Sequence, residues 1–378
     1  MPGSKHTFPG ATAIAGVCLL GVAMEAGQST PVQDRPPMVE DVFKSVVLLK
    51  GIPVDTFFEA MGMFANAMGN DCTFCHSSTA VFDKAAFAVP TPRIQRARQM
   101  IVMMNAINKT YFGGQPRLTC FTCHSGNQSP QSDPNLDLQY GAPLDNSNVR
   151  DFPSDPGISA NEVFDKYLQA IGGTERLARV SSLVAKGTYE GFDTAFAKVP
   201  VEMFARSPDQ HTTIVHLEAG DSVRTYNGRN GWMAGPDTPM PLVTLSGGNL
   251  DRARLEAILL FPAGIRQAFS QWRVGRAVLG DQEVRVVQAT EAGQPVVNLY
   301  FDESGLLVRL VRWTQTPVGF VPTQIDYTDY RDVAGVKMPF RRKVSQTYMQ
   351  MTIELSDVQP NVPIDAARFA RPTPRPAA

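Results

Sequence analysis

The chain has 378 residues, which is enough for two or three domains of ordinary size. Its 35 Lys and Arg residues against 36 Asp and Glu residues give a net charge of -1, so no basic excess indicates nucleic-acid binding. With 43% hydrophobic and 19% charged residues, the composition excludes a disordered, collagen-like or coiled-coil chain. A mean hydropathy of -0.14 excludes a polytopic membrane protein.

The first 26 residues have the three-part pattern of an export signal. Lys5 precedes an apolar run, Ala11 to Met24, and small residues follow as candidate cleavage sites. A membrane span needs about 20 residues, so this shorter run predicts a signal peptide at residues 1–26, with an uncleaved anchor as the second interpretation. Cys18 would be discarded with the signal, because Val17 is too bulky for lipoprotein processing. We therefore expect the mature protein in the periplasm or on the outer face of the membrane.

Residues 38–126 are predicted to contain one helix–turn unit twice. Val39 to Lys50 is amphipathic and predicts a first, short helix. The next helix begins at Pro53, with acidic residues in its first turn, and ends near Met68 before a Gly-Asn pair. Another helix is predicted from Pro92 to Tyr111, ended by a Gly-Gly pair. Each of these two longer helices is followed by a Cys-x-x-Cys-His motif.

The remaining chain is predicted to form a linker at 127–157 and a sheet domain at 158–371. The linker is rich in Asn, Asp, Ser and Pro, and the sheet domain opens with a capped helix, Ser159 to Ile171. A further helix is expected from Asp251 to Phe261, and Asp302–Gly305 has the residues of a hairpin turn. Strands are predicted at Leu183–Tyr189, Pro200–Ala205, Thr212–Leu217, Val223–Tyr226, Val284–Ala289, Val296–Phe301, Leu306–Trp313, Thr323–Tyr327, Val344–Tyr348 and Met351–Leu355. The fold class is α+β, with helices first and a larger antiparallel sheet domain after them.

The four cysteines of the mature chain lie in the two motifs, Cys72, Cys75, His76 and Cys120, Cys123, His124. This motif is the attachment signature of haem c. Two thiols three residues apart add to the two vinyl groups of one porphyrin, and the adjacent His reaches the iron. A four-Cys zinc site, a thioredoxin-like pair or two disulfides would not explain a His after both second cysteines. We predict two covalently bound haem c groups, with His76 and His124 as iron ligands.

The second axial ligand of each iron is predicted to be a methionine. Only His211 and His216 remain in the mature chain, and both lie in the predicted sheet domain, so local histidine donors are lacking. Methionines are abundant on the helices before the motifs. Spacing alone leaves Met61 against Met63 for the first haem, and Met100 against Met103 or Met104 for the second.

Three basic residues precede Met100 on the predicted helix, namely Arg93, Arg96 and Arg98. Haem propionates are anionic and are often paired with arginine, so these side chains are candidate propionate partners. A solvated helix face is the equally weighted alternative.

Several segments of residues 38–126 resemble the cytochrome c subunit of photosynthetic reaction centres, and more closely its two-haem relatives in non-phototrophic bacteria. They are Val42-Phe43-Lys44, Leu49-Lys50-Gly51, Cys72-Thr-Phe-Cys75-His76, Arg98-Gln-Met100 and Leu118-Thr-Cys120-Phe-Thr-Cys123-His124. In that family a Met on the helix before each haem is the sixth ligand, and the motif context implies Met61 and Met100. The family often has Arg-Gly after its second signature, where this chain has Ser125-Gly126.

The sheet domain resembles exported lipoprotein-sorting-type half-barrels, in which a curved sheet wraps around a helix. The similar segments are Tyr167-Leu-Gln-Ala-Ile-Gly-Gly-Thr, Asp302-Glu-Ser-Gly-Leu-Leu-Val-Arg and Asp329-Tyr-Arg-Asp-Val-Ala-Gly-Val-Lys-Met-Pro. The resemblance implies a hollow that can hold an acyl chain. Trp232, Trp272 and Trp313 are expected to pack in the core of this domain.

These features predict an extracytoplasmic dihaem cytochrome that transfers single electrons between membrane or periplasmic partner proteins. A peroxidase-like haem enzyme is the first alternative. It would need an open iron and a nearby acid or base, for which Asp71 and Asp83 are the nearest carboxylates in sequence. The second alternative is a carrier of a lipid or quinone-like ligand in the sheet domain.

Overall fold

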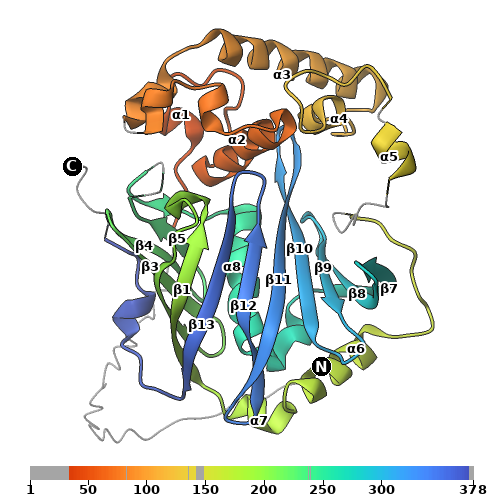
Figure 1. Ribbon diagram of the computed structural model, residues 1–378, viewed down its shortest axis with the longest axis vertical. Coiled ribbons are helices and arrows are strands. Elements are labelled where there is room, and N and C mark those ends of the chain that lie inside the picture. Colours follow the sequence, from red (N-terminus) through yellow and green to blue (C-terminus); the bar gives the residue numbers. More distant parts are fainter. Residues whose placement is uncertain are drawn as a thin grey trace, which may run out of the picture. The chain divides into compact units, whose positions relative to one another are not determined.

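The computed structural model describes residues 34–81, 83–134, 136–141, 149–236, 238 and 240–373. The predicted signal peptide at 1–26, with Cys18, lies outside the described residues. The structure is α+β, as predicted, with helices in the first part of the chain and a large antiparallel sheet in the second (Figure 1). No helix in the described part of the chain is both long and apolar enough to cross a lipid bilayer.

The sheet is an open, curved half-barrel of thirteen strands within the described residues (Figure 1). Strands that follow one another in sequence pair with each other, except for β6 and β7, and β1 pairs with β13, which joins the first half of the domain to the second. The edges are β6 and β7. The strands are β1 (Ser182–Gly191), β2 (Val199–Arg206), β3 (Gln210–Leu217), β4 (Gly220–Asn227), β5 (Gly231–Ala234), β6 (Val243–Thr244), β7 (Gln271–Leu279), β8 (Gln282–Thr290), β9 (Val297–Phe301), β10 (Leu307–Thr316), β11 (Gly319–Val333), β12 (Val336–Ser345) and β13 (Gln350–Pro360).

Each of the ten predicted strands overlaps a strand of the structure, but three strands were not predicted. The predicted Val344–Tyr348 was largely wrong, since it shares only Val344 and Ser345 with β12, which begins at Val336, and β11 is longer at both ends than the predicted Thr323–Tyr327. Strands β5 and β6 are only four and two residues long, too short to show a period of two. Strand β7 contains Gly275 and an irregular burial pattern. Strand β12 ends at Ser345 and not at Tyr348, because the chain turns there and Gln346 N–H donates to Met349 O at 2.8 Å.

The concave face of the sheet is filled by α6 (Ala160–Ala170), α7 (Thr174–Ala178), α8 (Gly247–Leu260) and η5 (Pro262–Gln267). Helix α6 begins as predicted, with Ser159 and Glu162 forming a capping box. Its Phe164 is fully buried and meets Phe301 edge-on at a ring distance of 6.1 Å. The predicted core role of the tryptophans is confirmed, because Trp232 and Trp313 are buried and the ring of Trp272 meets the ring of Phe164 edge-on.

In the N-terminal region, the first predicted helix is wrong beyond its first turn. Helix α1 spans only Val39–Val42, and not up to Lys50. The chain instead doubles back, since Val39 N–H donates to Ile52 O at 3.0 Å and the Glu40 carboxylate accepts from Gly51 N–H at 3.0 Å. These long-range bonds are not visible in a helical hydrophobic pattern.

The two longer helices agree with the sequence. Helix α2 spans Val54–Met68 with Pro53 as its N-cap residue, and it ends at Gly69 in the left-handed conformation with φ of 61°. Helix α3 spans Pro92–Tyr111 and is capped by the Thr91 hydroxyl. Short elements lie between and after these helices: η1 (Cys72–Phe74), η2 (Ser78–Val81), η3 (Lys84–Ala88), α4 (Cys120–His124) and α5 (Leu136–Tyr140).

Helix α2 packs directly on the sheet domain and contacts β10, β11 and α8. Its carboxylates Asp55 and Glu59 are buried, and each side chain is only 3% exposed. Asp55 accepts hydrogen bonds from the backbone N–H of Ser246 at 2.7 Å and from its hydroxyl at 2.5 Å. Ser246 is the N-cap residue of α8, which starts four residues before the predicted Asp251. This contact from α2 explains the early start, which the Gly-Gly pair there would not favour on its own.

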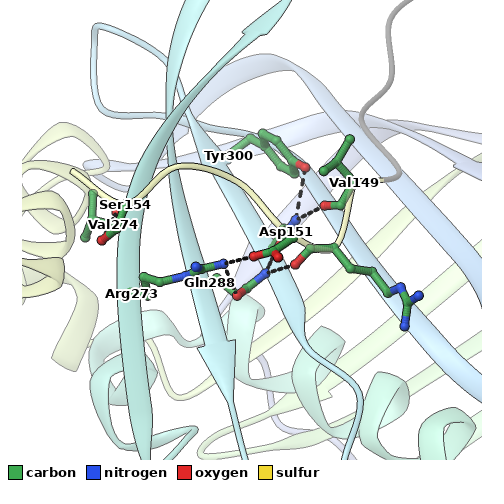
Figure 2. Close-up of polar contacts among 9 residues, drawn as sticks. Val149, Asp151, Ser154, Arg273, Val274, Gln288 and Tyr300 are labelled. Atoms are coloured by element: carbon green, nitrogen blue, oxygen red, sulfur yellow. Dashed lines mark hydrogen bonds and ion pairs between the residues drawn. The ribbon is translucent and has the colours of Figure 1, made fainter. Parts of the chain in front are cut away.

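The end of the predicted linker is bound to the sheet (Figure 2). The buried side chain of Asn298 donates to Val149 O at 3.0 Å, and Gln288 donates to Arg150 O at 2.8 Å. Ser154 pairs with Gly275 of β7, and the ring of Phe152 covers that glycine so closely that a Cβ atom would not fit. Residues 149–155 therefore act as a strap along β7, β8 and β9.

Candidate functional site

The first Cys-x-x-Cys-His motif lies on a short turn directly after α2. Cys72 opens η1, and Asp71 caps it, since its carboxylate accepts from Thr73 N–H at 2.8 Å and from the Thr73 hydroxyl at 2.6 Å. Downstream, the Thr91 hydroxyl donates to Cys75 O at 2.6 Å. The turn is thus held from both sides by α3 and its own cap.

The second motif is a helix in its own right. Thr119 and Thr122 form a capping box at the start of α4, and Ser125 ends the helix in the left-handed conformation with φ of 50°. In one helical turn, residues i, i+3 and i+4 share a face, so Cys120, Cys123 and His124 point to the same side. This is the arrangement that one porphyrin needs from two thiols and a proximal His.

Both motif histidines have the same hydrogen-bond arrangement. His76 Nδ1 lies 3.0 Å from Phe87 O, and His124 Nδ1 lies 3.1 Å from Asn127 O. A carbonyl oxygen only accepts, so Nδ1 carries the proton in each ring and Nε2 presents its lone pair. Within the described residues, no hydrogen bond reaches either Nε2. Metal-bound histidines are typically held in this way by their second nitrogen.

The four motif cysteines are free thiols. Among the described residues, no cluster of three or more His, Cys, Asp or Glu side chains could hold a metal ion by itself. Burial raises the pKa of Cys120 to about 11 and also raises the pKa of Cys72 and Cys75. Redox-active Cys-x-x-Cys pairs have lowered thiol pKa values. The raised pKa values of Cys72, Cys75 and Cys120 therefore do not match a thioredoxin-like pair.

The candidate methionines differ in burial. Met63 and Met104 are 5% and 7% exposed and pack in one apolar cluster with Val318 and Val321 of the sheet domain. Met103 is 47% exposed. Met61 and Met100 are partly buried, and Met61 lies at the margin of the same cluster. Met63 and Met104 thus have a packing role already.

Two of the three candidate propionate partners are engaged with the main chain. Arg93 donates to Phe74 O at 2.7 Å and lies over the Phe74 ring at 4.1 Å. Arg98 donates to Ser45 O at 3.0 Å. Arg96 is exposed on the same helix. The sequence could not distinguish these roles, because carbonyl acceptors carry no residue signature.

The structure also identifies residues that the sequence did not single out. Phe87 belongs to η3, eleven positions after His76, and its carbonyl orients the His76 ring while its own ring packs edge-on against it at 5.1 Å. The η3 segment is attached to the sheet domain by Lys84, whose ammonium donates to Thr238 O at 2.6 Å. For Phe87, no sequence signal exists. Asn127 lies only three residues after His124, and this short spacing could have suggested its carbonyl as the hydrogen-bond partner of the His124 ring.

Asn108 is another residue that the sequence did not single out. It is 5% exposed on α3, donates to Leu118 O at 2.8 Å and accepts from Leu118 N–H at 2.9 Å. These two hydrogen bonds fix the loop that leads from α3 into the second motif. A buried amide with both ends paired is costly to remove, because two backbone groups lose their partner.

We expect Asn108→Ala to lower the free energy of unfolding by about 1–3 kcal/mol. Urea unfolding followed by circular dichroism would measure this. The control is Asn105→Ala on the same helix, where the side chain is exposed. An equal loss of stability in both variants would show that the Leu118 contact contributes nothing.

The remaining functional candidates are less suited to their suggested roles. Asp71 and Asp83, the carboxylates considered for a haem enzyme, both cap 3-10 helices, and Asp83 accepts from Ala85 N–H at 2.9 Å. The cavity on the concave face of the sheet has a volume of about 70 Å³ and is lined by residues such as Tyr167, Ile171 and Met203. Pockets for drug-sized ligands have about 300–1,000 Å³.

Comparison with known proteins agrees with the motifs. Residues 22–136 match the family described as "Photosynthetic reaction centre cytochrome C subunit". The chain is 26% identical over 122 residues to the photosynthetic reaction center cytochrome c subunit of Roseobacter denitrificans. This alignment covers 29% of the chain and 33% of that relative.

Three solved structures are similar at a low level. The first is a DUF1329 family protein from Desulfovibrio piger, with a TM-score of 0.40 and 10% identity over 56% of this chain and 96% of that chain. The second is a putative outer membrane lipoprotein-sorting protein domain from Vibrio parahaemolyticus, with a TM-score of 0.37 and 10% identity over 55% of this chain and 94% of that chain. The third is a LolA superfamily protein from Nitrosomonas europaea, with a TM-score of 0.37 and 12% identity over 56% of this chain and 98% of that chain. The part of the chain that carries both Cys-x-x-Cys-His motifs is thus similar to the cytochrome c subunits of photosynthetic reaction centres.

Proposed function

We propose that this protein is an exported dihaem c-type cytochrome that transfers single electrons between redox partners. The observation that carries the proposal is the matched pair of histidines, each with Nδ1 bonded to a backbone carbonyl and Nε2 free beside two thiols. Haem c supplies an iron that changes oxidation state by one electron. The first group would be held by Cys72, Cys75 and His76, and the second by Cys120, Cys123 and His124.

The surface around the motifs suits two large apolar groups. Most of the large hydrophobic side chains that are exposed in the described chain belong to this region and not to the sheet domain. The exposed residues of the region at 38–126 are Val47, Leu48, Phe87, Val89, Val102, Met103, Tyr111, Phe112 and Phe121.

Met61 and Met100 are our proposed sixth ligands. Both are partly buried on the helices that precede the motifs, whereas Met63 and Met104 are packed inside the apolar cluster. A thioether that already fills a core would leave a cavity if it turned toward an iron. Arg96 is the proposed propionate partner, because its guanidinium lies on an exposed part of α3.

The partners that fit this proposal are proteins that donate and accept single electrons, in the membrane or on its outer side. The similarity to reaction-centre cytochromes supports membrane-associated partners. The chain covers only a third of its reaction-centre relative, and it carries two haem motifs. Docking to a photosynthetic reaction centre is therefore not part of the proposal.

The proposal is tested by expressing the full chain with a c-type maturation system and analysing the exported protein by haem-stained gel and intact mass. We expect the mass of two haem groups and loss of residues 1–26. Cys72→Ser with Cys75→Ser should remove one haem, and Cys120→Ser with Cys123→Ser the other. Cys18→Ser is the matched control and should keep both. A protein without covalent haem would overturn the proposal.

The methionine assignment gives a separate expected result. Met61→Ala should abolish the Met–iron charge-transfer band of one oxidised haem and lower its reduction potential, because Met/His ligation raises the potential. Met63→Ala, two residues along the same helix, should keep that band and cost about 2–5 kcal/mol of stability through the cavity it leaves. The reverse pattern, with the band lost only in Met63→Ala, would assign the ligand to Met63.

A further inference from the structure

One hairpin of the sheet domain reaches into the region of the haem motifs. Strands β10 and β11 pair Thr316 with Gly319, so the chain turns over Pro317 and Val318 (Figure 1). The side chains of Val318 and Val321 are fully buried. They lie in the apolar cluster that also contains Met63 of α2 and Met104 of α3. The hairpin tip thus belongs to the core of the helical region.

The same tip touches the start of the second motif. A Cβ atom on Gly319 would lie 2.6 Å from Thr119 Cγ2 and 3.6 Å from Met63 Cε. Thr119 is the N-cap residue of α4, and the next residue, Cys120, packs on the same apolar cluster. Gly319 has a φ of 129°, a backbone angle that L-residues with a side chain rarely adopt. The close approach therefore depends on glycine at this position.

The hairpin is held in a fixed position from both sides. The Thr316 hydroxyl donates to Gly319 O at 2.8 Å across the turn. The guanidinium of Arg150, on the strap at residues 149–155, lies over the Phe320 ring at 4.1 Å. Since Arg150 is itself anchored through its carbonyl to Gln288, the sheet determines where the tip lies.

We propose that the hairpin tip Thr316–Val321 is a positioning element for the second haem, and that it sets the reduction potential of that haem by fixing α4 and excluding water from Cys120. The inference rests on the proposed function. Potentials of haem proteins depend on burial and on the environment of the ligands, and a drier site disfavours the more highly charged oxidised iron. It also gives the sheet domain a role in the redox chemistry.

The test uses the full-length dihaem protein and three variants. Val318→Thr places a hydroxyl in the apolar cluster at nearly constant volume, and Gly319→Ala presses on Thr119. Gly280→Ala is the matched control, because Gly280 has φ of 60° in the β7–β8 turn and nothing within 4 Å of the added methyl group. Potentiometric titration of each protein, and of the same changes in a Cys72→Ser/Cys75→Ser background, assigns each potential to its haem.

We expect Val318→Thr and Gly319→Ala to lower the potential of the second haem, with a smaller shift at the first haem and none in Gly280→Ala. Circular dichroism checks that each variant is folded, and Gly319→Ala serves if Val318→Thr does not fold. If both haems are bound and Gly319→Ala shifts the second potential no more than Gly280→Ala, the inference is overturned and the proposed function stands. Absence of haem from the unmodified protein would overturn both.

Discussion

Replacing Arg312 by methionine should lower the free energy of unfolding by about 3–5 kcal/mol, one of the two largest effects that we expect from a single change in the sheet domain. Arg312 belongs to β10 and is 2% exposed. Its guanidinium donates to Thr314 Oγ1 at 3.0 Å, to Asn249 Oδ1 at 3.2 Å and to Gly248 O. Methionine has a comparable length but none of these donors.

The reason for the large effect is the buried charge around Arg312. Glu59 of α2 is 3% exposed, and burial raises its pKa, while the positive charges of Arg312, Arg252 and Arg224 act in the opposite direction. One Glu59 oxygen, Oε2, has no hydrogen-bond partner among the described residues. Removing Arg312 takes a compensating positive charge away from this carboxylate and leaves Gly248 O and Asn249 Oδ1 without its donors, and uncompensated buried charges and unpaired polar groups are costly.

Guanidinium denaturation of the two proteins would measure the difference. The matched control is Arg331→Met, since Arg331 also lies in a strand and pairs with Asp329 at 2.6 Å, but both side chains are about half exposed. Exposed pairs contribute about 0–1 kcal/mol. Equal losses in Arg312→Met and Arg331→Met would show that burial of the α2 carboxylates against the sheet arginines has no special weight.

The sequence predicted best those features that depend on nearest neighbours. The bounds of α3 follow from Pro92 at its start and from the Gly-Gly pair after its end, and the structure has the same bounds. The capping box at Ser159 and the Asp302–Gly305 turn are likewise local, and both are present. The two Cys-x-x-Cys-His motifs needed only spacing.

The sequence could not predict the contacts between the helical region and the sheet. Asp55 and Glu59 fit the positive end of a helix, whereas the structure buries them against Ser246 and the arginines of the sheet domain. Nothing in the sequence around Val318 indicates that it packs with Met63 and Met104. Such contacts are set by tertiary packing, which overrides local preference.

The second large effect is a dependence of stability on pH that comes from His211. This residue lies on β3, is 5% exposed, and its Nε2 is 3.1 Å from Thr213 Oγ1. Burial lowers the pKa of His211 to about 4, and the positive charges of Arg342 and Arg224 act in the same direction, against Glu256. An unfolded histidine has a pKa of about 6.5.

Between pH 6.5 and 4 the unfolded chain therefore binds one more proton at His211 than the folded protein does. The free energy of unfolding then falls as the pH falls through this window, by about 3 kcal/mol in total, and it is unaffected by this residue above the window. His211→Gln keeps a buried polar side chain that does not titrate.

Between pH 7 and pH 4 we expect the unfolding free energy of the unmodified protein to fall by about 3 kcal/mol more than that of His211→Gln. Urea titration of both proteins at each pH would measure this. His216→Gln is the control, because it removes a histidine of the same strand whose side chain is about one-third exposed and leaves the buried His211 in place. Parallel curves for the unmodified protein and His211→Gln would mean that the folded protein takes up the proton at His211 after all. In that case the negative charge of Glu256, which acts against the lowering of the pKa of His211, would have to compensate the buried charge.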